Sequence, residues 1–181
     1  MPRHPYPWWS HYTFENRLRR LIHRPEELFA PYVRPGQRVL EIGCGLGFCT
    51  LPLAELVGPE GRVTATDVVP ELLDRLAQNA EQAGLAGRIE PVLCAAERLE
   101  LPAEHDFALA FWSMHETDDP ALAARRIRAA LRDGGGFMVI EPVWHVRRRV
   151  FQGIADAVRS AGFTERPAPH IAISQTAFFR R

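Results

Sequence analysis

The chain has no lysine: all 22 of its lysine-plus-arginine positions are arginines. Schiff-base catalysis, and with it pyridoxal-phosphate chemistry, needs a lysine amine, and a P-loop needs a lysine for its phosphates. Both function classes are therefore excluded. A base that acts near neutral pH must come from His, Cys, Asp, Glu or Tyr.

An excess of one charge, paired cysteines and long apolar runs are also missing. The 22 arginines are balanced by 22 acidic residues, so neither nucleic acid nor an anionic membrane is the default partner. Cys44, Cys49 and Cys94 are odd in number and lack CxxC spacing, which predicts reduced thiols, no metal site and a cytoplasmic location. No apolar run approaches the roughly 20 residues that span a bilayer, and residues 1–9 lack the apolar core of a signal peptide.

Segments typical of strands and helices alternate along most of the chain. Strands are predicted at 38–42, 62–67, 89–93, 107–111 and 137–141, and helices at 48–57, 70–83, 120–131 and 145–161. The segment 107–111 has no polar alternation, as expected of a buried parallel strand. This order predicts a single α/β domain over residues 1–181, with a doubly wound, mostly parallel sheet.

The two ends of the chain depart from the alternation. Two final strands are predicted near 163–167 and 171–178, and the connection between them is too short for a crossover, so they should be antiparallel. Residues 1–33 are predicted to form an arm with helical pieces at 13–22 and 26–32, ahead of a core at 34–181. The sequence gives no indication of the oligomeric state.

A glycine-rich segment follows the first predicted strand. Glu41 stands two residues before Gly43, and Gly45 and Gly47 follow in GxGxG spacing. Glycines there allow a tight turn and a close approach of the backbone to a ligand. The GxGxxG fingerprint of dinucleotide-binding domains is not matched, because residue 48 is Phe48.

A second acid ends the second predicted strand. Asp67 lies about twenty residues beyond Gly47, where a carboxylate can accept hydrogen bonds from both hydroxyls of a ribose. Glu41, in turn, can accept a hydrogen bond from a ligand ammonium or order the glycine loop. The two acids and the loop together favour a nucleoside-containing cofactor.

From about Arg34 to Arg181 the chain resembles the class I S-adenosylmethionine-dependent methyltransferases. The resemblance rests on 41–47, 64–67, 92–97 with Leu101-Pro102, and 131–135. It implies a Rossmann-like sheet of seven strands with an antiparallel terminal strand and S-adenosyl-L-methionine as cofactor. A Rossmann-like domain for another nucleotide is the alternative reading.

The resemblance also implies roles for individual residues around the cofactor. Gly43, Cys44, Gly45 and Gly47 would lie along its methionine half, Glu41 would orient the loop or the amino group, Asp67 would hold the ribose, and Val68 would pack on the adenine. Family members often carry an Asp after the third strand, but Ala95 stands there in this chain. Adenine recognition would then fall to the backbone near Ala95 and Ala96, or to Glu97.

The methyl acceptor is expected at the carboxyl ends of the strands. His115 and Glu116 follow the fourth strand and are the first candidate bases, with Glu141 and His145 after the fifth strand as the next. For His115, Glu116 and Glu141 the alternative is a structural role, in which the side chain forms local hydrogen bonds and holds its loop. Trp112 is expected to pack beside the cofactor.

An aromatic cluster in the arm is larger than the core of such a fold needs. It includes Trp8, Trp9, His11 and Tyr12. These side chains could close the site as a lid, stacking on a flat acceptor or shielding the sulfonium. They could equally form a hydrophobic clasp, and the sequence leaves both open.

The predicted function is methyl transfer to a small-molecule acceptor by in-line displacement, which needs mainly alignment and desolvation. Two alternatives remain: a regulatory protein that binds S-adenosylmethionine without turnover, and a methyltransferase that acts on a macromolecule. The arginine-rich helical segments are more typical of a solvated face than of a nucleic-acid site. The attacking atom of the acceptor is not indicated.

Overall fold

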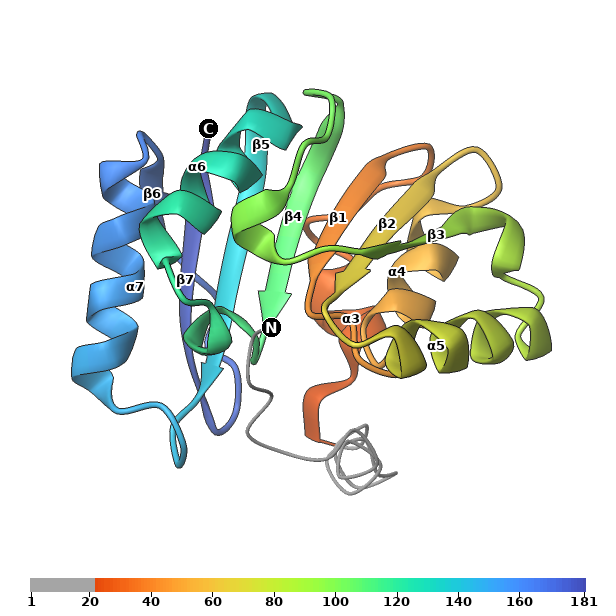
Figure 1. Ribbon diagram of the computed structural model, residues 1–181, viewed down its shortest axis with the longest axis horizontal. Coiled ribbons are helices and arrows are strands. Elements are labelled where there is room, and N and C mark those ends of the chain that lie inside the picture. Colours follow the sequence, from red (N-terminus) through yellow and green to blue (C-terminus); the bar gives the residue numbers. More distant parts are fainter. Residues whose placement is uncertain (1–21) are drawn as a thin grey trace.

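The computed structural model describes residues 22–181, which build one seven-stranded sheet flanked by helices (Figure 1). The strands are β1 (Arg38–Ile42), β2 (Arg62–Asp67), β3 (Ile89–Leu93), β4 (His105–Phe111), β5 (Leu131–Pro142), β6 (Thr164–Arg166) and β7 (Ser174–Arg180), in the order β3-β2-β1-β4-β5-β7-β6. Strand β7 runs antiparallel to both β5 and β6, whereas β1 to β5 pair in parallel. The predicted fold class is confirmed.

Helices cover both faces of the sheet (Figure 1). They are α3 (Pro25–Phe29), α4 (Thr50–Val57), α5 (Pro70–Gln82), α6 (Pro120–Ala130) and α7 (Arg148–Ser160), with short 3-10 turns η2 (Ala86–Arg88), η3 (Ala96–Arg98) and η4 (Met114–Glu116). One apolar cluster joins α3, α4 and α5 to the sheet, and a second joins α6 and α7 to its other face. Over residues 22–181 no helix has the length and apolar character needed to cross a bilayer.

Local sequence signals explain where the longer helices begin. Pro70 and Pro120 open α5 and α6, where the missing N–H of proline costs nothing. The carboxylate of Asp119 accepts a hydrogen bond from the N–H of Leu122 at 2.9 Å and so caps α6. Burial of one apolar side of each helix against the sheet then fixes its orientation.

Strand β5 is longer than the predicted segment 137–141. It begins at Leu131, directly after α6, although three glycines follow in 134–136. The pairing shifts there: Leu131 pairs with His105, but Gly136 already pairs with Phe107. The glycines therefore do not form a loop between the helix and the strand. Residues 132–135 are instead an irregular part of β5 itself.

The observed bounds of several other helices and strands differ slightly from the predicted ones. Helices α4 and α7 begin two or three residues later than predicted, because turns occupy 45–49 and 143–145. The last strand, β7, covers Ser174–Arg180 rather than 171–178, and α3 is shorter than the predicted helix 26–32. The helical piece predicted at 13–22 lies almost wholly outside the described residues, which begin at residue 22.

The carboxyl ends of β1, β2, β4 and β5 lie along one edge of the sheet, at the bottom of Figure 1. The described chain also enters at this edge. His23 is buried, its Nε2 lies 3.2 Å from the carbonyl oxygen of Ala172, and its ring packs edge-on against Trp112 at 5.3 Å. The edge therefore gathers the predicted site residues.

Candidate active site

The glycine loop turns sharply between β1 and α4. Gly43, Gly45 and Gly47 have φ angles of 69°, 54° and 99°, in the left-handed region that favours glycine. A Cβ atom on Gly43 would lie only 2.5 Å from Cβ of Ser113. The loop thus needs glycine at this position both for its backbone conformation and for its close contact with the turn after β4.

Asp67 connects the end of β2 to this loop. Its carboxylate accepts hydrogen bonds from the N–H of Gly45 at 2.9 Å and from the N–H of Val69 at 3.1 Å. A carboxylate has about four acceptor positions, so these two bonds leave capacity for further donors. Asp67 is therefore placed to hold the loop and to accept hydrogen bonds from a ligand.

Glu41 is buried beneath the loop. The hydroxyl of Thr50 donates to its carboxylate at 2.6 Å, and the hydroxyl of Thr66 donates to its backbone carbonyl at 2.9 Å. The bond to Thr50 ties the start of α4 to β1. This contact fits the predicted role of Glu41 in orienting the loop. Both predicted roles of Glu41 stay predictions.

The predicted adenine side lies at the ends of β2 and β3. Val68 and Ala95 are half-buried and Ala96 is buried. One carboxylate oxygen of Glu97 accepts a hydrogen bond from the N–H of Asp119 at 3.2 Å, which ties η3 to the start of α6. The half-buried apolar surface of Val68 and Ala95, with the unused acceptor positions of the Glu97 carboxylate, fits a flat heterocycle such as adenine.

These observations agree with the requirements of S-adenosylmethionine. A tight glycine loop with exposed backbone at Gly43, a carboxylate with unused acceptor capacity at Asp67 and apolar surface at Val68 follow one another along the edge. The cofactor residues predicted from the sequence are thus brought together, although they come from three separate strand ends. Their individual contacts with the cofactor remain predictions.

The turn after β4 packs against the glycine loop. The hydroxyl of Ser113 donates to the carbonyl of Ile42 at 2.6 Å, directly before the loop. The preceding residue, Trp112, has a φ of 61°, which is unusual for a side chain of this size. Strained backbone of this kind is often found at functional sites.

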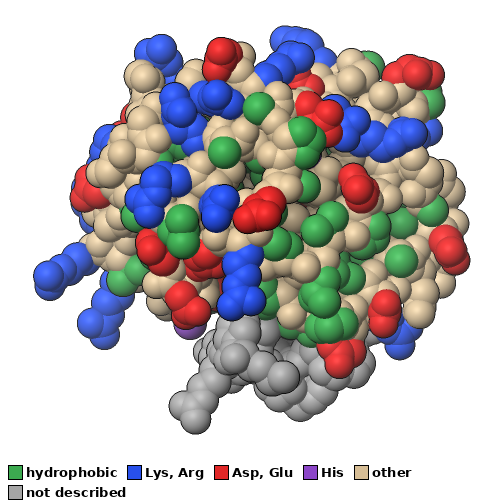
Figure 2. Space-filling model, turned by 45° about the horizontal axis from the view of Figure 1, so that its top comes forward, with side chains coloured by type: hydrophobic (Ala, Val, Ile, Leu, Met, Phe, Trp, Pro, Cys, Tyr) green, Lys and Arg blue, Asp and Glu red, His purple; other side chains and the backbone are tan. Residues whose placement is uncertain are grey.

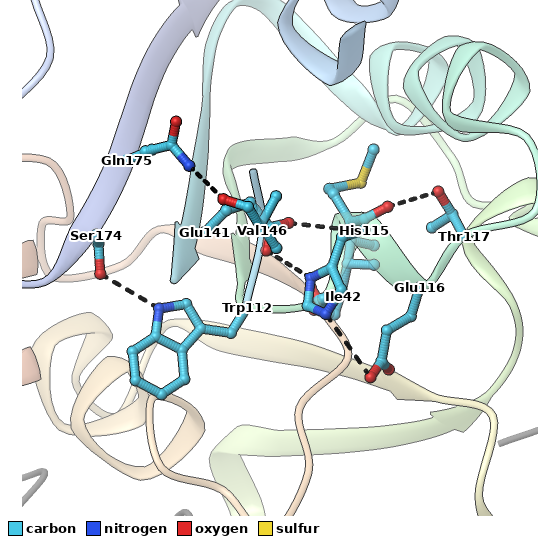
Figure 3. Close-up of polar contacts among 11 residues, drawn as sticks. Ile42, Trp112, His115, Glu116, Thr117, Glu141, Val146, Ser174 and Gln175 are labelled. Carbon is cyan, nitrogen blue, oxygen red and sulfur yellow. Dashed lines mark hydrogen bonds and ion pairs between the residues drawn. The ribbon is translucent and has the colours of Figure 1, made fainter. Parts of the chain in front are cut away.

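The side chain of Trp112 faces the β5–β7 side of the edge. Its indole N–H donates to the hydroxyl of Ser174 at 3.3 Å (Figure 3). Its ring meets that of Trp144 at 4.8 Å, edge to face. Ser174 and Trp144 lie on the far side of β4 from β1. The predicted packing of Trp112 beside the cofactor stays a prediction.

His115 and Glu141 form a close pair at the ends of β4 and β5 (Figure 3). The ring Nδ1 lies 2.6 Å from Oε2 of Glu141, and the backbone N–H of His115 donates to Oε1 at 3.1 Å. Glu141 is fully buried, and 12% of the His115 side chain is exposed. Nε2 of His115 lies 4.0 Å from Oε1 of Glu116, and the ring of His145 lies 5.0 Å from that of His115.

The electrostatics of this pair follow from burial and mutual contact. Burial lowers the pKa of His115, but the hydrogen bond and the charge of Glu141, helped by Glu116, outweigh it and hold that pKa above its usual value. Burial raises the pKa of Glu141, and its contacts with His115 offset part of the rise. The imidazole is therefore a stronger base than an isolated histidine.

The structure brings all four predicted acceptor-side residues into one group: His115, Glu116, Glu141 and His145. The predicted lid residues Trp8, Trp9, His11 and Tyr12 lie outside the described residues. The sequence analysis did not identify Thr50 and Ser113, whose hydroxyls form hydrogen bonds that hold the glycine loop in place. A hydroxyl residue at the first turn after a glycine loop was the available signal for Thr50.

A family model described as "Methyltransferase domain" matches residues 39–135. The chain belongs to the methyltransferase domain family. This membership confirms the predicted class I methyltransferase family and S-adenosylmethionine as its cofactor.

Curated methyltransferases match part of the chain. The "Ubiquinone/menaquinone biosynthesis C-methyltransferase UbiE" of Shewanella woodyi is 30% identical over 122 residues, 65% of this chain and 49% of that protein. The "Aklanonic acid methyltransferase DauC" of Streptomyces sp. strain C5 is 34% identical over 110 residues, 60% of this chain and 50% of that protein. The chain thus matches about half the length of these relatives.

Solved structures agree on the fold. A SAM-dependent methyltransferase from Aquifex aeolicus superposes with a TM-score of 0.87 at 18% identity, covering 97% of this chain and 98% of that one. The [4+2]-cyclase SpnF superposes with a TM-score of 0.71 at 26% identity, covering 82% of this chain and 60% of that one. The same fold therefore occurs in a protein named for a different reaction.

Proposed function

We propose that this protein transfers the methyl group of S-adenosylmethionine to a small-molecule acceptor at the carboxyl edge of the sheet. The observation that carries the proposal is the contact between Ser113 and Gly43. This contact brings the glycine loop against the turn after β4, which contains His115. A ligand on the loop and an acceptor beside His115 would therefore be neighbours.

Binding of the cofactor is assigned to the residues whose geometry fits it. The backbone at Gly43 to Gly47 would face the methionine half, Asp67 the ribose, and Val68 with Ala95 and Ala96 the adenine. When bound, S-adenosylmethionine supplies an electrophilic methyl group on a sulfonium. The protein's own contribution is alignment and exclusion of water.

Three observations favour a small acceptor over a nucleic acid. Two arginines in or just after α6 already have partners: Arg126 pairs with Glu100 at 3.8 Å, and Arg132 pairs with Asp106. Basic and acidic side chains are interspersed on the face seen in Figure 2, whereas nucleic-acid binding needs a continuous basic surface. The names of UbiE and DauC also refer to small organic molecules.

A second candidate function is favoured by SpnF, which shares the fold and is named as a cyclase. On that reading the chain binds S-adenosylmethionine but transfers no methyl group. The replacement of the usual Asp by Ala95 fits this reading as well, because it removes one contact to the cofactor. Binding and transfer must therefore be measured separately.

Calorimetry with S-adenosylmethionine and S-adenosylhomocysteine tests the binding step. We expect saturable binding that Asp67→Ala weakens by about 10- to 100-fold, because hydrogen bonds to a charged group contribute about 1.5–3 kcal/mol. Glu81→Ala, at an exposed position on α5, is the control and should leave the affinity unchanged. Tight binding of NAD without binding of either sulfur nucleoside would contradict the assignment.

Incubation with methyl-labelled S-adenosylmethionine and a bacterial metabolite extract tests the transfer step. We expect label in the small-molecule fraction. Label found only in protein or RNA would indicate a macromolecular acceptor. Saturable binding without any transfer would support the second candidate.

A further inference from the structure

The buried carboxylate of Glu141 has an unusual set of partners. Both of its oxygens are used by one residue, His115, through the backbone N–H and ring Nδ1. Among residues 22–181 no arginine shares this carboxylate. A fully buried carboxylate costs several kcal/mol of desolvation, so a residue that only braced a loop could be replaced by an amide at lower cost.

The contact fixes which nitrogen of His115 carries the proton. An ionised carboxylate can only accept, so the ring must donate from Nδ1. In the neutral ring, Nε2 then has a lone pair. Among residues 22–181 its nearest charged neighbour is Oε1 of Glu116, which is 4.0 Å away and too far for a hydrogen bond. Within this part of the chain Nε2 can therefore accept a proton.

The position of His115 in the chain places it close to the glycine loop. His115 follows Ser113 by two residues, and Ser113 touches the glycine loop at Gly43. Within the described part of the chain, the charged and titratable groups that face the ring are Glu141 from β5, Glu116 from η4 and His145 from the loop after β5. Helix α7 also packs against η4, and its buried residues are all apolar.

We propose that His115 is the general base of the transfer, that Glu141 is a positioning residue holding its Nδ1–H tautomer, and that the acceptor attacks as an enolate or phenolate. The inference rests on the proposed function and deepens it. An acceptor of this class carries its proton at neutral pH and needs a base, whereas an amine or a thiol needs one much less.

Nε2 takes the proton from the hydroxyl or the α-carbon of the acceptor. The electron pair left on the acceptor forms the new bond to the methyl carbon, while the carbon–sulfur bond breaks and its pair stays on sulfur as a neutral thioether. The positive charge of the sulfonium is thereby replaced by that of the His115 imidazolium, beside the Glu141 carboxylate, and the proton then leaves to solvent.

Imidazole nitrogen NMR on the ligand-free protein tests the role of Glu141 without any turnover. We expect the neutral His115 ring to be protonated at Nδ1, with a pKa above the usual value of about 6.5. In Glu141→Gln the charge is lost but burial remains, so the pKa of His115 falls and the tautomer is no longer fixed. His115→Asn assigns the signal. An unchanged pKa and tautomer would overturn the positioning role.

The same variants are then assayed with carbon-13-methyl S-adenosylmethionine and the metabolite extract. We expect His115→Asn to lower the initial rate by about 100-fold or more and Glu141→Gln by about 10-fold, with S-adenosylhomocysteine affinity unchanged. Because the base must be neutral, the rate falls as pH drops through the pKa of His115. In Glu141→Gln that inflection moves to lower pH, in step with the NMR result.

Controls and product analysis complete the test. His170→Gln, at an exposed histidine of the loop before β7, should keep the wild-type rate. The carbon-13 shift of the product methyl reports the atom it is bound to, and a methyl on sulfur or nitrogen would overturn the acceptor class. If Glu141→Gln does not fold, Glu141→Asp replaces it, and a reduced His115 pKa is again expected.

The assays distinguish a failure of the general-base role from a failure of the proposed function. Transfer by the wild type that His115→Asn retains in full would refute the general base and leave the pair as a brace for η4. Absence of transfer by the wild type would contradict the proposed function itself and remove the role of base with it. The NMR measurement would then still decide whether Glu141 sets the state of the ring.

Discussion

At the scale of single residues, Gly43 is required for two separate reasons: its backbone conformation and the lack of space for a side chain. Gly43 has a φ of 69°, and the space where its Cβ would lie is already taken by Ser113. Gly36 has a similar φ of 82°, but nothing lies within 4 Å of the position its Cβ would take. Comparing substitutions at the two positions therefore separates the cost of the backbone conformation, which both share, from the cost of the steric clash, which only Gly43 has.

We expect Gly43→Ala to destabilise the protein more than Gly36→Ala does. The left-handed conformation costs about 1–2 kcal/mol in each variant, and the clash with Ser113 adds about 1–3 kcal/mol in Gly43→Ala alone. Urea unfolding measures both. Calorimetry should find S-adenosylhomocysteine binding weakened only in Gly43→Ala. Equal losses of stability in the two variants would mean that the Ser113 turn yields easily.

At the scale of elements, α6 and β5 are coupled because one follows the other without a loop. The cap at Asp119 fixes the start of α6, and Glu97 of η3 accepts the N–H of the same residue. Asp119→Ala should lower the free energy of unfolding by about 1 kcal/mol, since a helix N-cap typically contributes that much.

The matched variant is Asp118→Ala, next to the cap on an exposed position. Its unfolding free energy should stay within about 0.5 kcal/mol of wild type, as for surface changes away from such features. Urea unfolding followed by circular dichroism compares the two. A loss as large in Asp118→Ala would argue against a specific cap.

At the scale of the whole molecule, the arm at residues 1–12 can be tested by deletion. The described chain begins at the carboxyl edge, where the ring of His23 packs on Trp112. We expect deletion of 1–12 to spare folding, to weaken cofactor binding only modestly and to abolish transfer, because the aromatic residues would no longer exclude water from the acceptor. Thermal unfolding, calorimetry and the label assay check the three parts.

The full-length variant Trp8→Ala/Trp9→Ala isolates the aromatic side chains from the length of the chain. It should lose transfer in the same way as the deletion. Full turnover by the truncated protein would favour the clasp over the lid.

Much of the fold could be predicted from the sequence alone. The segments 38–42, 62–67 and 89–93 were predicted with the bounds they have, because apolar runs between turn residues are local signals. The glycine loop and Asp67 were also recognisable, since their chemistry depends on spacing along the chain. The antiparallel last strands followed from the length of one connection.

Only the tertiary structure decided which side chains meet. His115 and Glu141 were each candidates, but their pairing over 26 residues depends on the register of β4 against β5. The contact of Ser113 with Gly43 likewise depends on β4 lying beside β1. Periodicity and spacing specify elements, because those signals are local. Contacts between strand ends arise only when the sheet order and the packing of both faces have been set.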